Sequence, residues 1–417
     1  MNSPEQYEIK LTNEAQLHYQ TRIENDERLA KEHAKIRSGA SPAVLEPFAK
    51  AYLGLFLEID STFPPEQRIR FIAGDDLANA VMDGLTVVLE KIVLPSPEEI
   101  GSKMAEDERI EIGYVALVSM DLLIKKYTYT EKAFAQLNKD ILSSILCFHY
   151  ANSNEYRNTW IDALIEYDRE LVTHTLQKFW LVQMDKGMRY LPGLGGLLKT
   201  HAGQKLVGDI ILPILSGWRG YKKKTLNVLL AVALRYSNRE KLLPIIESIL
   251  EREENLNPRM RIVWMTSAFI LEPDKYWQQM QDYTYRSKEK LLPLLDFSIV
   301  LLDEITIDVQ ILSKIIRLVA PKFPPHIDDF GALAANPQKT LRLFYELANR
   351  EEAINDELKW LRTARVMKIV SPILDEVESL HQLNSQSDNF PEFSSFMLNL
   401  LNSGKLKEKR SRFKNKL

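Results

Sequence analysis

A short apolar phrase with a central proline recurs along this chain of 417 residues. Residues 211–215 read ILPIL, residues 242–246 read LLPII and residues 291–295 read LLPLL, and a weaker copy, SPIL, stands at 371–374. Repeated use of one helical unit is the simplest explanation of such a phrase. Successive prolines lie 31 (244 minus 213), 49 (293 minus 244) and 79 (372 minus 293) residues apart, which predicts degenerate helical units with insertions.

The stretch 205–250 holds two copies of the phrase and shows the pattern best. Three apolar segments are separated there by short polar turns, and each segment has the i, i+3, i+4 spacing of a buried helical face. We find no alternating strand segment bounded by hairpin turns in the first half of the chain. The sequence therefore predicts an all-α fold, organised as an irregular HEAT-like α-solenoid or an extended helical array.

Composition agrees with a folded helical protein. Hydrophobic residues make up 45% of the chain, charged residues 27%, and glycine occurs only 16 times. The net charge of −3 gives no overall field that would attract nucleic acid or a membrane surface. The apolar runs are interrupted by charge before about 18 residues, so we expect no membrane-spanning helix.

Cys147 is the one cysteine of the chain, which excludes an internal disulfide and suits a reducing compartment. The N-terminus lacks the basic and apolar regions of a signal peptide. We therefore expect a soluble, cytoplasmic protein.

Composition shifts and capping signals divide the chain into five predicted parts. These are a polar N-terminal helix (1–40), a helical array (41–320, its HEAT-like part at 205–319), a proline-rich loop (321–337), a C-terminal helical piece (338–402) and a basic tail (403–417).

Local signals set the predicted helix ends in the first half of the array. Ser96-Pro97-Glu98-Glu99 has the composition of a capping box at a helix start. Ser41-Pro42 starts a helix that we expect to run through Ile59 to the stop at 63–65, and Gly74 opens the next one. Further helices are expected at 133–146 and 160–182, and in the second half of the array at 259–271, 288–304 and 309–319.

Two family resemblances follow from these segments. Residues 242–250 and 291–295 resemble the inner helix of HEAT-like repeats, over about residues 205–319. Residues 49–56 and 320–325 resemble, more loosely, parts of the helical arms that accompany NACHT-type signalling NTPases of bacteria. The first resemblance implies a protein-binding scaffold, and the second implies a regulatory or defence-associated module without the nucleotide-binding domain.

Residues 193–200, GLGGLLKT, invite comparison with a phosphate-binding loop. The phosphate cradle needs glycine directly before its lysine, but Leu198 stands there, and a charged stretch precedes the glycines where a buried strand is required. Residues 299–304, IVLLDE, look like a magnesium-binding strand end, but their apolar pattern starts at Leu291 and is long enough for a helix. We therefore predict helices at both places, and an NTPase with degenerate motifs stays a lesser alternative.

No other motif predicts catalysis or a metal site. The seven histidines are scattered without zinc-ligand spacing, and Cys147 lies in an apolar segment that predicts a buried, inert thiol. His326 and its neighbours in the proline-rich loop fit a capping pattern better than a metal site. We expect no cofactor and favour a non-catalytic protein.

Two basic segments are the predicted binding residues. Cations next to aromatic side chains can hold phosphates and stack bases, whereas basic runs often serve only for solubility. The residues are Trp218, Arg219, Tyr221, Lys222, Lys223 and Lys224 in a turn between helices, and Lys409, Arg410 and Arg412 in the tail.

The function favoured by the sequence is a protein–protein interaction scaffold or a sensor module. Its stacked helices would present a surface to a protein partner. Nucleic-acid binding through the turn at Arg219–Lys224 and the tail is the alternative.

Overall fold

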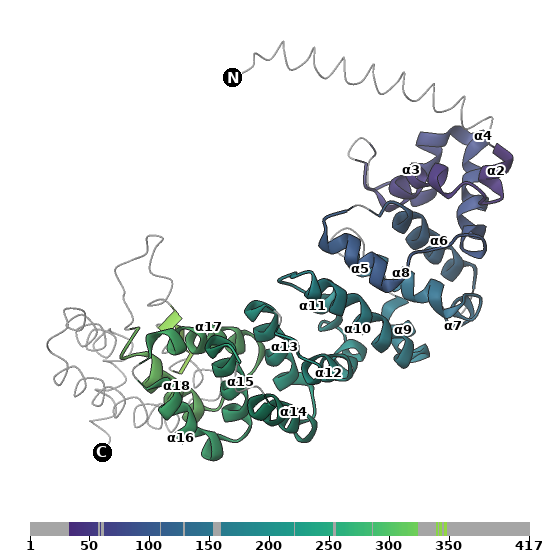
Figure 1. Cartoon of the computed structure of the whole chain (residues 1–417). Helices are drawn as coiled ribbons and strands as arrows, with labels where there is room; N and C mark the ends of the chain where they lie inside the picture. The colour runs from purple at the N-terminus through teal and green to yellow at the C-terminus, as the bar shows by residue number, and fades with distance from the viewer. Residues whose placement is uncertain are drawn as a thin grey trace, which may run out of the picture. The chain divides into compact units, whose positions relative to one another are not determined.

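The computed structural model describes residues 33–323 with short gaps, and three residue pairs beyond them (Figure 1). The gaps are 57–58, 60–61, 109, 128–129, 153–159, 221, 253–255 and 286, and the pairs are 339–340, 342–343 and 346–347. Every regular element in this part of the chain is a helix and none is a strand, so the predicted all-α class is confirmed. Within the same residues, no helix combines the length and apolar character that crossing a membrane requires.

The chain divides into two compact units, Met1–Ile210 and Ile211–Leu417. The division falls inside helix α12 (His201–Ser216), at a place that no composition shift marks. The described helices of the first unit, besides the start of α12, are α2 (His33–Arg37), α3 (Pro42–Leu53), α4 (Pro65–Val87), η1 (Val88–Glu90), α5 (Pro97–Ala105), α6 (Ile112–Lys126), α7 (Thr130–Phe134), α8 (Lys139–Ala151), α9 (Trp160–Tyr167), α10 (Arg169–Asp185) and α11 (Leu194–Leu197).

Apolar helix faces hold the first unit together, and α6 and α10 each pack on several other helices. Helix α6 packs on α3, α4 and α8, and α10 packs on α5, α8 and α9. Helix α4 lies so close to α2 that a Cβ at Gly84 would stand 2.0 Å from the carbonyl oxygen of Ile36, so only glycine fits there. Helix α6 is buried along most of its length because neighbours cover it on several sides.

Some of the predicted helix ends in this unit are confirmed. Helix α3 starts at Pro42, and α5 starts with the predicted capping box. In that box the Glu99 amide donates to Oγ of Ser96 at 3.2 Å, and the Ser96 amide donates to Oε2 of Glu99 at 2.7 Å.

Other predicted ends are wrong, because capping residues (a glycine in one case, Asn or Asp in others) divide the predicted helices or end them earlier than the apolar pattern suggests. Helix α3 ends at Leu53, where Gly54 takes a left-handed conformation with φ 75°. By contrast, the predicted start at Gly74 is confirmed: α4 consists of two helical segments joined by a kink at Gly74 (φ 73°), and the second segment opens there, although the first segment from Pro65 was not predicted. The predicted helices at 133–146 and 160–182 are each two helices, split where Asn138 caps α8 and Asp168 caps α10.

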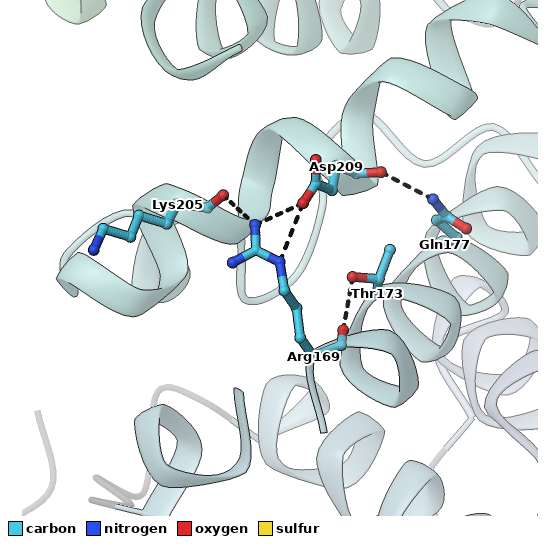
Figure 2. A network of polar contacts seen from close by, with 5 residues as sticks. All are labelled: Arg169, Thr173, Gln177, Lys205 and Asp209. Carbon is cyan, nitrogen blue, oxygen red and sulfur yellow. Dashed lines mark hydrogen bonds and ion pairs between the residues drawn. The ribbon is translucent and has the colours of Figure 1, made fainter. Parts of the chain in front are cut away.

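A polar network joins α10 to α12 (Figure 2). Arg169 donates from Nη2 to Oδ2 of Asp209 at 2.6 Å and to the carbonyl oxygen of Lys205 at 2.7 Å. The side chain of Gln177 donates to the carbonyl oxygen of Asp209 at 3.2 Å. That carbonyl lacks its usual partner within α12, because the residue four positions later is Pro213, which has no N–H. Gln177 therefore satisfies a group that the proline leaves unbonded.

The described helices of the second unit follow the end of α12. They are α13 (Lys223–Tyr236), α14 (Arg239–Arg252), α15 (Pro258–Leu271), α16 (Pro273–Thr284), α17 (Lys288–Glu304) and α18 (Val309–Val319). The three predicted helices of 205–250 correspond to α12, α13 and α14, and the predicted helices at 259–271, 288–304 and 309–319 are confirmed as α15, α17 and α18. Helix α16 was not predicted.

Helices α13, α15 and α17 pack side by side in this unit (Figure 1). Helix α15 is in the middle, since α13, α14, α16 and α17 all contact it, and residues 262–269 are buried without interruption. Two ion pairs show that α13 and α17 run parallel: Lys223 pairs with Asp296 near the start of α13, and Arg235 with Glu304 near its end.

The repeated proline phrase occupies the same register in two helices of this unit. Pro244 is the sixth residue of α14, and Pro293 is the sixth residue of α17. At that position proline removes only a bond at the edge of the first turn, so both helices continue. In α12 the proline comes near the C-terminal end instead. In each of these helices the carbonyl four residues before the proline loses its donor, and in α12 Gln177 donates to that carbonyl.

Three described residue pairs after the predicted proline-rich loop, 339–340, 342–343 and 346–347, are helical. Thr340, Leu343 and Leu347 are buried, while Lys339 and Arg342 pair with Asp296 and Asp303 of α17. Most of the predicted loop, the weaker proline phrase, the rest of the C-terminal piece, the basic tail and the polar helix before His33 lie outside the described residues.

Candidate functional site

Trp218, the first residue of the predicted binding turn, belongs to the core. Its side chain is 5% exposed and packs edge-on against Trp264 of α15, with ring centroids 6.1 Å apart and planes at 76°. An edge-to-face pair of this kind adds to the stabilisation from burial. Trp218 therefore anchors the turn before α13 and leaves no exposed ring for a ligand, while Tyr221 lies outside the described residues.

Lys223, the first residue of α13, is bound within the protein. Its Nζ lies 2.8 Å from Oδ2 of Asp296, and Nζ of Lys339 lies 2.7 Å from the other oxygen of the same carboxylate. Burial alone would raise the pKa of Asp296, but hydrogen bonds from the two lysines outweigh it and hold the pKa below its usual value. Asp296 thus stays ionised and fixes the start of α13 against α17.

The remaining predicted cations of the turn form what we call the basic ledge: Arg219, Lys222 and Lys224, all exposed. They lie at the start of α13, where the helix dipole is positive. No side chain caps this start, because the N-cap residue is Lys222, and the first turn contains no acidic residue. Such a start favours an anion supplied from outside, since amide N–H groups without intrahelical partners and exposed cations lie close together in the chain there.

A second group of cations, not predicted from the sequence, lies at the starts of α15 and α17. Arg259 and Lys288 are exposed there, and Lys290 is half-buried. The Nζ of Lys290 lies 3.8 Å from the ring centroid of Tyr283 and donates to the Tyr283 carbonyl oxygen at 2.9 Å. Basic residues in two first turns were the signal in the sequence, but only the fold shows that these turns are neighbours.

The residues that resembled a phosphate-binding loop have structural roles. Residues 194–197 form the single turn α11, and no strand precedes it in the described chain. Gly193 has φ +81°, and a Cβ there would lie 1.9 Å from Cδ1 of Tyr150, so this glycine makes room for the tyrosine ring. Residues 299–304 belong to α17, which confirms the predicted helix.

The reactive side chains of α8 are buried. Burial raises the pKa of the Cys147 thiol well above its ordinary value, so the thiol stays protonated, as predicted for an inert cysteine. Burial also lowers the pKa of His149 to about 4, so this imidazole is neutral at physiological pH. Its ring packs edge-on against Tyr150 and Trp160. Among the residues that the structure describes, no group of three or more His, Cys, Asp or Glu side chains could hold a metal ion.

The predicted tail residues Lys409, Arg410 and Arg412, and His326 of the proline-rich loop, lie outside the described residues. No family model, no curated protein and no solved structure matches this chain. The basic ledge is therefore the candidate site on the strength of its own geometry.

Proposed function

We propose that this protein is a non-catalytic helical interaction module whose basic ledge binds an acidic segment of a partner protein. One observation carries the proposal: Arg219, Lys222 and Lys224 are exposed together at a helix start that has no side-chain cap and no acidic residue in its first turn. Carboxylates of a partner would meet both the helix dipole and the three cations. Lys223 supports the site by holding α13 to Asp296.

The number of cations favours an acidic protein over nucleic acid. Proteins that bind DNA tightly neutralise on the order of 6–10 phosphates, which the three side chains of the ledge do not supply. The chain as a whole carries a net charge of −3, so long-range attraction of a polyanion is weak. A few carboxylates in a short segment match the ledge better. Nucleic-acid binding by the ledge with the tail is the alternative that the experiment below also tests.

The finer proposal concerns architecture and partner. The pairs α13–α14, α15–α16 and α17–α18 are joined by short connections, which supports a HEAT-like arrangement of the second unit. The resemblance to arms of bacterial signalling NTPases suggests a separately encoded protein of that class as the partner, with a regulatory or defence role.

The test measures binding of a fluorescein-labelled twelve-residue glutamate peptide to the full chain by anisotropy. The triple reversal R219E/K222E/K224E should weaken binding by about tenfold or more, since three exposed pairs contribute roughly 0.2–1 kcal/mol each and reversal adds repulsion. The matched control K199E/K205E/K241E makes the same charge change at exposed lysines outside residues 219–224. A third variant, K409E/R410E/R412E, measures the contribution of the tail.

Equal loss of affinity in the ledge and control variants would overturn the proposal, because the binding would then depend only on net charge. A single-stranded or duplex DNA of twenty nucleotides serves as the second probe. Tighter binding of this DNA than of the peptide, lost in both the ledge and tail variants and steeply dependent on salt, would establish the nucleic-acid alternative instead.

A further inference from the structure

The start of α13 is one of four basic helix starts in the described part of the second unit, with those of α14 (Arg239-Glu240-Lys241), α15 and α17. The first turns of α13 and α15 contain no acidic residue, and that of α17 contains Glu289 between Lys288 and Lys290. Helix starts usually carry acidic residues, which complement the positive end of the dipole. Three neighbouring helices with cations at their starts make this end of the unit electropositive beyond the ledge itself.

Contacts of Tyr283, near the end of α16, bring the starts of α15 and α17 together. Its hydroxyl donates to the carbonyl oxygen of Pro258 at 3.4 Å, and its ring and carbonyl bind Lys290. Arg259 and Lys288, the exposed cations next to these contacts, therefore lie at the same end of the unit. We call this pair the second basic site.

The ion pairs of α17 relate the second basic site to the ledge. Helices α13 and α17 are parallel, and Lys223 at the start of α13 pairs with Asp296, eight residues after Lys288 (296 minus 288). Eight residues of helix span about 12 Å, so the start of α17 extends about that far beyond the start of α13. The ledge and the second basic site thus lie at the same end of the unit and are offset by about 12 Å along the helix axes.

We infer that one extended acidic segment binds across both sites, from the basic ledge to the starts of α15 and α17. This inference rests on the proposed function and specifies its partner. An extended chain rises about 3.3 Å per residue, so a segment of about four residues covers the axial offset and a longer one covers the lateral distance as well. Charge complementarity selects the occupant. Five exposed cations lie at or just before these helix starts, and Glu289 is an exposed opposing charge in the first turn of α17; the cations are Arg219, Lys222, Lys224, Arg259 and Lys288.

The experiment compares glutamate peptides of three and ten residues on the full-length protein. In the natural chain, the longer peptide should bind more tightly than the shorter one because it reaches both sites. The ratio of the two dissociation constants should exceed the ratio of the peptides' charges. The variant R259E/K288E should weaken the ten-residue peptide by about fivefold, the effect of reversing two exposed pairs, and abolish most of the gain with length. New acidic residues in first turns suit the helix dipole, so the variant should fold.

The variant E289K provides a gain of function that loss of folding does not imitate. Removing the opposing charge should tighten binding of the ten-residue peptide severalfold. If neither R259E/K288E nor E289K changes that affinity while the ledge reversal does, the shared segment is wrong and the proposed function stands. If the ledge reversal itself has no effect, the proposed function fails, and the extended segment fails with it.

Discussion

Two short turns of this protein, one before α12 and one before α13, carry residue types that ligand sites use, and the fold uses them in opposite ways. Residues 193–200 combine glycines with a terminal Lys-Thr, as phosphate loops do, and residues 218–224 combine aromatic and cationic side chains, as nucleic-acid surfaces do. Sequence reasoning rejected the first turn and favoured the second.

In the first turn, packing accounts for the glycine that is conformationally special. Gly193 is left-handed and lies against Tyr150, whereas Gly195 and Gly196 have open space around them. In the second turn, packing accounts for Trp218 and an ion pair accounts for Lys223, which leaves three cations exposed at one helix start. Each residue of a motif therefore has to be assigned separately, because one residue can pack in the core while its neighbour in sequence is exposed on the surface.

The largest effect is expected from Trp218→Ala. Removing this buried ring leaves a cavity against Trp264 and should cost about 3–5 kcal/mol, as for other buried aromatic residues. The measurement is the urea midpoint of the full chain, followed by tryptophan fluorescence and far-UV circular dichroism. Trp218→Phe keeps an aromatic ring and should lose less than half as much. A midpoint unchanged by the alanine variant would mean that Trp218 is a surface residue and therefore free to bind a ligand.

Gly193→Ala should have the next largest effect. The added methyl group would clash with Tyr150 and impose a left-handed conformation on alanine, at a combined cost of about 2–4 kcal/mol. The same urea experiment measures it. Gly196→Ala is the matched control three positions later, where nothing lies within 4 Å of a new Cβ. Alanine there should change the free energy of unfolding by no more than about 0.5 kcal/mol. Equal losses in both variants would contradict the packing role of Gly193.

A smaller, pH-dependent effect is expected from Asp296→Asn. The folded pKa of Asp296 is held below the unfolded value, so its contribution is complete above the unfolded pKa of about 4 and is lost as pH falls towards the folded pKa. The variant should lose about 1–3 kcal/mol at pH 7. Urea midpoints at pH 7, 5 and 3.5 should show the difference from the natural chain shrinking only at the lowest pH.

Asp209→Asn is the control for that experiment, because its pair with Arg169 is about half exposed on both sides. Exposed pairs contribute at most about 1 kcal/mol, so this variant should change the midpoint little at any pH. A loss at Asp209 as large as the loss at Asp296 would show that burial does not distinguish the two carboxylates.

The helix starts were the most predictable part of the fold. Local signals that tertiary packing did not override mark several of them. These signals are the capping box of Ser96 and Glu99 and the apolar runs of α15, α17 and α18. The breaks at Asn138 and Asp168 were missed because a polar cap inside an apolar run resembles one more exposed position of a continuous helix. Helix α16 was missed because only Tyr276, Met280 and Thr284 are buried, which leaves a weak apolar pattern.

The candidate site was only partly predictable, for a different reason. The three cations of the ledge lie within residues 219–224, so their grouping was visible in the sequence. Asp296 lies 73 residues from Lys223, and no local pattern assigns one lysine to it and leaves its neighbours exposed. The second basic site joins residues of α15 and α17 through Tyr283, and only the fold brings them together.

The bond from Gln177 to the Asp209 carbonyl has a consequence for how this sequence can vary. A leucine at position 213 would restore the N–H that this carbonyl lacks, and the amide of Gln177 would then be redundant. With proline at 213, replacing Gln177 leaves a carbonyl of α12 without its protein donor. Residues 177 and 213 are thus expected to be epistatic: related sequences should keep the glutamine where they keep the proline and relax both together.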